Sequence, residues 1–252
     1  MRVLRVMYQD KIFHGALEDK TIRCLNTSLG LKDPVPLSEV QVLPAVMPTK
    51  VVCVGLNYHG HAREMNKEVP NEPLLFLKPP SAVIGTGEAI ICPAQSQDVH
   101  YEGELAVVMG KVCRKVKVAD VPDHVFGFTC ANDVTARDLQ NRDVQYTRAK
   151  GFDTFCPIGP WIETAVKDPG ELTLRTRVNQ EVRQEESTRD MIVSPYELVS
   201  YVSGIMTLMP GDIILTGTPS GVGTLHPGDE VHVEIDKVGV LMNRAIAESE
   251  TD

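Results

Sequence analysis

Residues 100–110 read HYEGELAVVMG, in which a polar start leads into an apolar run that Gly110 ends. The β-branched Val107 and Val108 favour an extended strand. Side chains two positions apart in a strand point to the same face, so Glu102 and Glu104 project together. Two adjacent carboxylates raise each other's pKa unless a cation lies between them. The stretch therefore predicts one strand with a candidate cation site at its start, although a solvated strand face remains the alternative.

Residues 127–140 read GFTCANDVTARDLQ and supply a third carboxylate. Asp133 ends a short apolar run, and the capping-box pattern from Thr135 to Asp138 predicts a helix over 135–145. A carboxylate between a strand and a helix can complete an oxygen shell with Glu102 and Glu104. Mg²⁺ and Mn²⁺ prefer such ligands.

Composition limits the classes of protein that fit. The chain has 252 residues, 42% of them hydrophobic, which is enough for one large core. A net charge of -9 argues against nucleic acid or an anionic membrane as a partner. We find no signal-peptide core and no run of membrane-spanning length. Six cysteines without a CxxC pair fit reduced thiols, so we expect a cytoplasmic protein.

The order of short runs predicts the organisation of the chain. Alternating runs before about residue 48 predict a small N-terminal β subdomain (1–48), followed by a large domain (49–247) and a tail (248–252). Many short strands recur in the large domain, whereas helices are expected only over 59–65, 135–145 and 194–207. The expected fold class is therefore mainly β with some α, without the regular strand–helix alternation of a Rossmann or TIM fold.

A glycine-rich loop, GTPSGVG, occupies residues 217–223 directly after an apolar strand. It lacks the Gly-Lys-Ser/Thr ending of a Walker A loop, and no helix follows as a dinucleotide site requires. Two interpretations stay open. One is a plain strand-to-strand turn, and the other is a cradle of backbone N–H groups for a carboxylate or phosphate.

His61 and Glu64 are three residues apart in the expected short helix and share one face. The carboxylate can orient the imidazole, which is the arrangement of a general base with its orienting group. A surface His–Glu pair is the alternative. Arg137 and Gln140 have the same spacing, and their guanidinium and amide suit a substrate carboxylate, unless they are ordinary surface groups.

Seven segments, in this order along the chain, together resemble the fumarylacetoacetate hydrolase family and cover about residues 50–245. They are Gly55-Leu56-Asn57-Tyr58, His61-Ala62-Arg63-Glu64, residues 73–79 (PLLFLKP), residues 101–105 (YEGEL), residues 132–140 (NDVTARDLQ), Ala149-Lys150 and residues 217–223 (GTPSGVG).

The resemblance implies a mixed β-roll or sandwich and a homodimer. It also assigns roles to residues: a divalent metal, Mg²⁺ or Mn²⁺ with Ca²⁺ as an alternative, on Glu102, Glu104 and Asp133; catalysis by His61, Glu64 and Lys150; and substrate contacts from Arg137, Gln140, Gly217 and Thr218. Full-length family hydrolases have a further Asp ligand from a larger N-terminal domain. No counterpart is found here, so water or substrate is expected in that position.

The implied activity is a metal-dependent hydrolase that breaks a C–C bond in an acylpyruvate, a small α-keto or enol carboxylate, with pyruvate enolate as leaving group. The same site could serve an isomerase of the 2-hydroxyhepta-2,4-diene-1,7-dioate type or an oxaloacetate-type decarboxylase. A role in aromatic catabolism is also expected. We expect segments 66–71 and 141–147 to build the acyl pocket. A non-catalytic metal-binding protein is the alternative of another class, but it would not need His61, Glu64 and Lys150. A nucleotide-binding role for the glycine loop ranks last.

Overall fold

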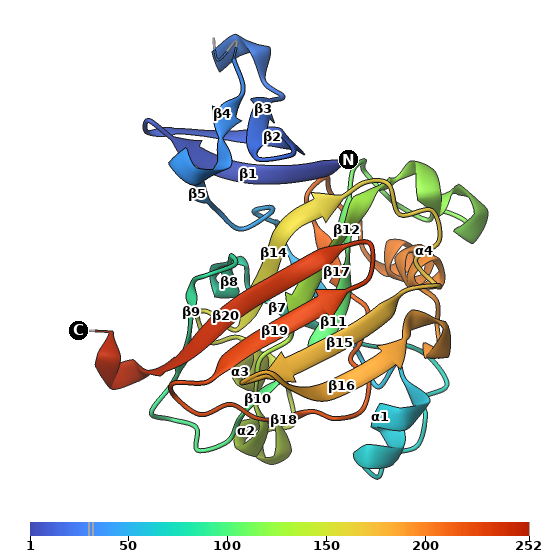
Figure 1. Ribbon diagram of the computed structural model, residues 1–252. Helices are drawn as coiled ribbons and strands as arrows, with labels where there is room; N and C mark the ends of the chain where they lie inside the picture. Colours follow the sequence, from blue (N-terminus) through green and yellow to red (C-terminus); the bar gives the residue numbers. More distant parts are fainter. Residues whose placement is uncertain (30, 32, 252) are drawn as a thin grey trace.

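The computed structural model describes residues 1–29, 31 and 33–251. Figure 1 shows a fold built mostly of strands, with few and short helices, as the sequence predicts.

The largest sheet has twelve strands and runs through the whole molecule. In spatial order its main path is β4 (Val35–Pro36), β3 (Thr21–Cys24), β2 (Lys11–Glu18), β1 (Arg2–Tyr8), β14 (Cys156–Glu163), β12 (Val125–Asn132), β11 (Gly103–Met109), β17 (Ile213–Leu215), β6 (Val51–Gly55) and β7 (Leu74–Lys78). Two short strands lie off this path: β5 (Gln41–Val42) beside β1, and β8 (Val83–Ile84) beside β14. Every residue of β11 is buried, because β12 and β17 flank it and both of its faces are covered.

Two smaller sheets complete the architecture. The five-stranded sheet has the order β16 (Glu181–Ser187), β15 (Thr173–Val178), β19 (Glu230–Ile235), β20 (Gly239–Ala247) and β9 (Ala89–Cys92). The three-stranded sheet has the order β13 (Thr135–Ala136), β10 (Val99–Tyr101) and β18 (Gly223–Thr224). In Figure 1 the five-stranded sheet lies over β11, β12 and β14. Leu105 and Phe128 from one layer share a core cluster with Leu174 and Val233 from the other, so the two sheets pack as a sandwich.

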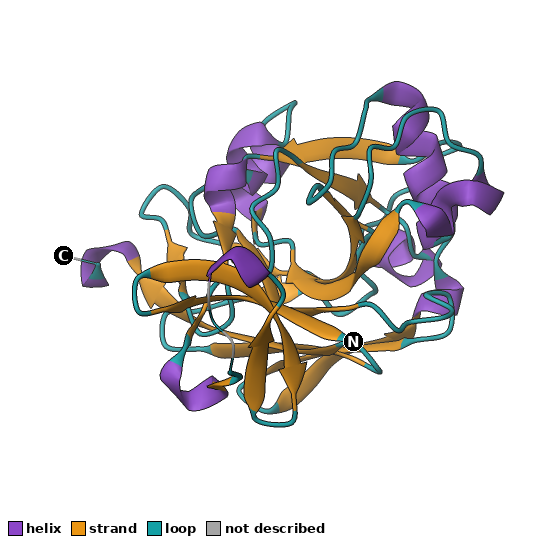
Figure 2. Cartoon of the chain, turned by 90° about the horizontal axis from the view of Figure 1, so that it is seen from above, coloured by secondary structure: helices purple, strands orange, loops and turns teal. Residues whose placement is uncertain are grey.

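The helices lie outside the layers of strands (Figure 2). The α-helices are α1 (His59–Glu64), α2 (Arg137–Arg142), α3 (Thr147–Lys150) and α4 (Pro195–Ile205). The 3₁₀ turns are η1 (Thr27–Leu29), η2 (Leu37–Glu39), η3 (Pro80–Ala82), η4 (Val118–Asp123), η5 (Thr188–Asp190) and η6 (Glu248–Glu250). Helix α4 confirms the prediction for 194–207: Ser194 and Glu197 form a capping box, and Leu198, Val199 and Val202 are buried. Within the described ranges, no helix has both the length and the apolar character needed to cross a membrane.

Strands β1 to β5 hold a small core of their own, made of Leu4, Val6, Phe13 and Ile22. This part of the chain lies at the top of Figure 1, in blue. Its first strand also pairs with β14, so the N-terminal strands continue the large sheet. The boundaries at residues 48 and 247 stay predictions.

The single strand expected over 100–110 is wrong in one respect, because the chain divides at Glu102 into β10 and β11, which belong to different sheets. Asn132 is the reason. Its Oδ1 accepts the N–H of Glu102 at 2.9 Å, and the Glu102 carbonyl accepts the N–H of Asp133 at 2.8 Å. Glu102 therefore leaves the regular ladder, although its side chain stays with that of Glu104.

The helix expected over 135–145 is also shorter than predicted, and its capping box is absent. Helix α2 begins at Arg137 after an N-cap at Ala136 that offers no side-chain cap. Thr135 lies in β13, and the single proton of its hydroxyl is directed at the Asp133 carbonyl, 2.8 Å away, and at Glu102 Oε1, 3.2 Å away. The Thr135 hydroxyl, which the capping pattern predicted to cap the helix, therefore contacts Glu102 and Asp133 instead.

Candidate active site

Antiparallel pairing of β11 with β12 assembles the three predicted carboxylates. The register sets Gly103 opposite Asn132 and Glu104 opposite Ala131, so Asp133, just past β12, lies beside Glu102. One oxygen from each of Glu102, Glu104 and Asp133 lies within 4.8 Å of the others, and all three residues are buried.

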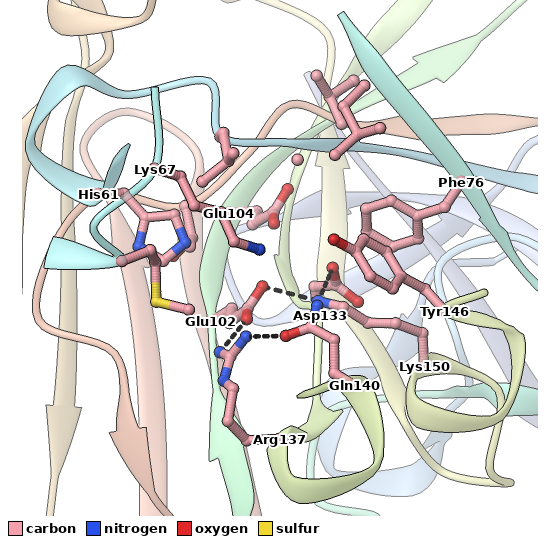
Figure 3. A pocket seen from close by; sticks show the side chains of 16 residues that line it. His61, Lys67, Phe76, Glu102, Glu104, Asp133, Arg137, Gln140, Tyr146 and Lys150 are labelled. Atoms are coloured by element: carbon pink, nitrogen blue, oxygen red, sulfur yellow. Dashed lines mark hydrogen bonds and ion pairs between the residues drawn. The ribbon is translucent and has the colours of Figure 1, made fainter. Parts of the chain in front are cut away.

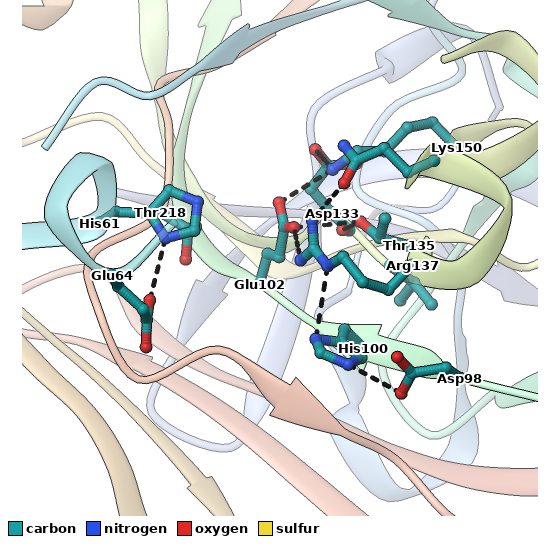
Figure 4. Close-up of polar contacts among 12 residues, drawn as sticks. His61, Glu64, Asp98, His100, Glu102, Asp133, Thr135, Arg137, Lys150 and Thr218 are labelled. Carbon is teal, nitrogen blue, oxygen red and sulfur yellow. Dashed lines mark hydrogen bonds and ion pairs between the residues drawn. The ribbon is translucent and has the colours of Figure 1, made fainter. Parts of the chain in front are cut away.

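Three buried cations neutralise two of these carboxylates, and Figure 4 shows two of the cations, Lys150 and Arg137. Lys150 Nζ lies 2.9 Å from Glu102 Oε2 and 2.6 Å from Asp133 Oδ2. Lys78 Nζ lies 2.6 Å from Asp133 Oδ1, and Arg137 pairs with Glu102. Burial alone would raise the pKa of Glu102, but the charges of Lys150 and Arg137 overcome it and hold this pKa well below its usual range. Burial alone would lower the pKa of Lys150, and the carboxylates of Asp133 and Glu102 instead raise it.

Glu104 is the carboxylate that no cation reaches among the ion pairs of the described residues. Its Oε2 accepts one hydrogen bond, from the backbone N–H of Gly217 at 2.6 Å. Burial raises the pKa of Glu104 well above its usual range, and the negative charges of Asp133 and Glu102 add to this shift. A buried cluster of hard oxygen donors with one carboxylate short of a counter-charge fits a divalent cation such as Mg²⁺ or Mn²⁺.

His61 and Glu64 form the predicted pair on α1. The Nδ1 atom of His61 lies 3.1 Å from Oε2 of Glu64, and His61 is buried. Oε1 of Glu64 accepts the backbone N–H of Gly221 at 2.9 Å, which ties the pair to the glycine loop. A carboxylate on Nδ1 places the second ring nitrogen, Nε2, as the one available for proton transfer.

One pocket gathers the predicted site residues (Figure 3). All ten except Glu64 and Gly217 line it: His61, Glu102, Glu104, Asp133, Arg137, Gln140, Lys150 and Thr218. Glu64 and Gly217 do not line the pocket, but each contacts a residue that does: Glu64 contacts His61, and Gly217 donates to Glu104. The glycine loop connects β17 to β18, as the turn interpretation expects, and its backbone N–H groups hold two carboxylates of the protein itself, Glu104 and Glu64. A cradle for a bound anion stays a prediction.

Arg137 and Gln140 meet on one face of α2, as their spacing predicts. One guanidinium nitrogen donates to Gln140 Oε1, and another donates to Glu102. Nε approaches Nδ1 of His100 at 3.5 Å, and His100 in turn contacts Asp98 at 2.9 Å. Arg137 therefore fixes Glu102 first, and only its remaining N–H groups are available to a ligand.

Four side chains received no role from the sequence: Lys67, Phe76 and Tyr146 line the pocket, and Lys78 contacts Asp133 outside the lining. Lys78 ends an apolar strand. The sequence signal that could have marked it as functional is a single lysine after this apolar run and just before Pro79 and Pro80. Lys67 and Tyr146 lie in the two segments expected to shape the pocket, and both line it. Phe76 stacks edge-on against Tyr146 at 5.5 Å and lies 5.0 Å from Lys150 Nζ, a cation–π contact.

Known proteins resemble this chain over nearly its whole length. The model of the fumarylacetoacetate (FAA) hydrolase C-terminal domain matches residues 50–246. The mitochondrial oxaloacetate tautomerase FAHD2A of Bos taurus is 46% identical over 241 residues, which cover 90% of this chain and 77% of the relative.

Solved structures agree with this result. The 2-hydroxyhepta-2,4-diene-1,7-dioate isomerase of Mycobacterium marinum has a TM-score of 0.90 and 42% identity, covering 98% of this chain and 99% of the other. Maleylpyruvate hydrolase of Sphingobium sp. SYK-6, solved with manganese(II) and pyruvate, has a TM-score of 0.83 and 33% identity, again over 98% and 99%. The pocket, the fold and these similarities agree, and the chain belongs to the fumarylacetoacetate hydrolase family of enzymes.

Proposed function

We propose that this protein is a divalent-metal-dependent enzyme that moves a proton at C3 of a 2-oxo carboxylate, which interconverts its keto and enol forms. One observation carries the proposal: His61 faces the Glu102–Glu104–Asp133 cluster across a single pocket. A base opposite a cation site is the arrangement that enolate chemistry requires.

Glu102, Glu104 and Asp133 would hold the metal. When bound, a divalent metal supplies Lewis-acid stabilisation of negative charge on the 2-oxo oxygen. Lys150 adds a fixed positive charge beside it. Two of the three ammonium N–H groups of Lys150 are directed at Glu102 and Asp133, which leaves the third for an oxygen of the substrate.

In the keto-to-enol direction His61 takes the proton from C3, and the 2-oxo oxygen gains a proton. In the reverse direction the protonated ring gives its proton to C3, and the enol oxygen loses its own. Glu64 orients the ring and stabilises its protonated form. Because Gly221 holds the other oxygen of Glu64, the carboxylate keeps its direction without blocking the pocket. His61 is the only imidazole that lines this pocket in the part of the chain that the structure describes.

Similarity to named relatives favours proton transfer over bond cleavage. The tautomerase at 46% identity and the isomerase at 42% both carry names of proton-transfer enzymes, whereas the hydrolase is 33% identical. The test is the rate at which enol oxaloacetate converts to the keto form, followed by the ultraviolet absorbance of the enol with Mg²⁺ or Mn²⁺ present. We expect acceleration that EDTA and Glu104→Gln both abolish. A rate equal to the uncatalysed one with either metal would contradict the proposal.

Hydrolysis of an acylpyruvate is the second candidate, because His61 could activate water instead of C3. The relative solved with manganese(II) and pyruvate supports this reading, since pyruvate is the product of such a cleavage. Release of pyruvate from acylpyruvates, coupled to lactate dehydrogenase, distinguishes the two candidates. Absence of pyruvate alongside rapid enol conversion would exclude cleavage.

A further inference from the structure

Most of the charged side chains that line the pocket form ion pairs with one another. The carboxylates are Glu102, Glu104 and Asp133, and the lysine and arginine side chains are Lys67, Arg137 and Lys150. Arg137 and Lys150 are engaged with Glu102 and Asp133. None of the ion pairs or side-chain hydrogen bonds among the described residues includes the ammonium group of Lys67. A divalent metal would pair with Glu104, and Lys67 would then remain as a cation without a counter-ion.

The backbone holds Lys67 next to the catalytic helix. Helix α1 ends in a Schellman motif: Asn66 takes the left-handed conformation, with a φ of 50°. The N–H of Asn66 donates to the Arg63 carbonyl at 3.1 Å, and the N–H of Lys67 donates to the Ala62 carbonyl at 3.0 Å. Asparagine is one of the few non-glycine residues that adopt this conformation readily. Lys67 is therefore fixed to the same short helix that carries His61.

The Lys67 side chain is exposed at the mouth of the pocket and directs its amino group inward, between His61 and Glu104 (Figure 3). The apolar side chains of Leu56, Met65 and Leu74 line the pocket with it. A ligand that reached from the carboxylate cluster to Lys67 would lay its carbon chain along these groups and its far end against the ammonium.

We propose that Lys67 binds the second carboxylate of a dicarboxylate substrate and so selects dicarboxylates over acids with a neutral far end. This inference rests on the proposed function, because the first carboxylate and the 2-oxo group must occupy the cluster end of the pocket. The charge of the ammonium matches the anion, and its exposed position lets the flexible stem adjust to the length of the chain.

The test is calorimetric binding of two ligands to the Mg²⁺-loaded protein: 2-oxoglutarate and its 5-methyl ester, which differ in the charge at the far end. 2-Oxoadipate and its 6-methyl ester, which are one carbon longer, test the same preference in case 2-oxoglutarate is too short to extend from the carboxylate cluster to Lys67. We expect the dicarboxylate to bind about tenfold more tightly than its ester in the wild type. Lys67→Met should remove this preference without weakening the ester, and Lys67→Arg should keep it. Lys111→Met, which removes an exposed lysine that does not line the pocket, is the matched control and should change nothing.

Equal affinities for acid and ester at both lengths in the wild type would overturn the proposal and leave the proposed function standing. A Lys67→Met variant with altered Mg²⁺ affinity but an unchanged ligand preference would also overturn it, because Lys67 would then serve only as a counter-charge for Glu104. If neither ligands nor pyruvate bound to the Mg²⁺-loaded protein, the proposed function itself would fail, and this inference with it.

Discussion

The backbone N–H of Gly217 donates a hydrogen bond of 2.6 Å to Oε2 of Glu104, although 113 positions separate the two residues. Glu104 has no other hydrogen-bond donor among the described residues, so this bond sets the direction of its carboxylate. Gly217 has a φ of 100°, and a Cβ placed on it would lie 2.7 Å from Cβ of Asn57. The bond therefore depends on a glycine at this position.

Gly217→Ala should damage the metal site as well as the fold. The positive φ costs an alanine about 1–2 kcal/mol, and the clash with Asn57 moves the N–H away from Glu104. We expect Mg²⁺ affinity, measured by calorimetry, to fall roughly 10- to 100-fold. Gly228→Ala is the matched control: its φ is 98° and a Cβ there meets nothing within 4 Å. Gly228→Ala should lower the stability of the protein but leave its Mg²⁺ affinity unchanged. Equal Mg²⁺ affinities for the two variants would contradict this role of Gly217.

Glu104→Gln should stabilise the metal-free protein at neutral pH. Because the pKa of Glu104 is raised in the folded state, the folded state binds the proton more tightly, and stability falls as pH rises from the ordinary carboxyl range through the raised pKa. The variant lacks this loss of stability, so we expect its free energy of unfolding at neutral pH to exceed that of the wild type by about 1–3 kcal/mol. Urea unfolding in EDTA across a pH series measures it. With Mg²⁺ the order should reverse, because only the wild type gains from binding. A wild type more stable than the variant in EDTA at neutral pH would refute the account of Glu104.

Lys78→Met should weaken the site through Asp133. The Lys78 ammonium is buried and donates to Asp133 Oδ1 at 2.6 Å and to the Val134 carbonyl at 2.9 Å. Loss of one partner of a buried pair costs about 3–5 kcal/mol, and loss of a group that orients a ligand costs about 10- to 100-fold in metal affinity. Lys50→Met, which breaks a pair with Asp212 outside this pocket, should lower stability but keep metal affinity. Unchanged Mg²⁺ binding in Lys78→Met would show that Asp133 needs no such support.

A homodimer is a further prediction, which the family resemblance supports. An apolar groove beside the N-terminal strands agrees with a covered surface, since Met47 and Phe126 line it and are 57% and 40% exposed. Light scattering at micromolar concentration should give twice the chain mass of 27.7 kDa. A single-chain mass at that concentration would contradict it.

Local pattern predicted much of this architecture. The apolar, β-branched run within 100–110 located β11 (Gly103–Met109), although not the break at Glu102, and the 3.6-residue period located α4. The i, i+3 spacing predicted the contact between His61 and Glu64. In each case the decisive interactions lie within a few residues in sequence, or within one face of one element.

Contacts between distant segments were beyond the reach of local pattern. Strand β14 was missed because Pro157 and Pro160 argue against a central strand, yet it pairs on both sides, with β1 and β12. Strand β16 was missed because a polar edge strand lacks an alternating apolar pattern. The role of Lys78 depends on a residue 55 positions away, and that of Gly217 on a pairing of β17 with β11. The sequence around Lys78 does not indicate its contact with Asp133, and the sequence around Gly217 does not indicate its contact with Glu104.

Deuterium incorporation at C3 of oxaloacetate in D₂O, followed by proton NMR with Mg²⁺, tests the central claim most directly. Proton transfer by His61 predicts rapid exchange in the wild type, a loss of about 10²- to 10⁴-fold in His61→Ala, and a smaller loss in Glu64→Gln, which leaves the imidazole in place. Exchange in the wild type no faster than in protein-free Mg²⁺ solution, or undiminished exchange in His61→Ala, would contradict the account.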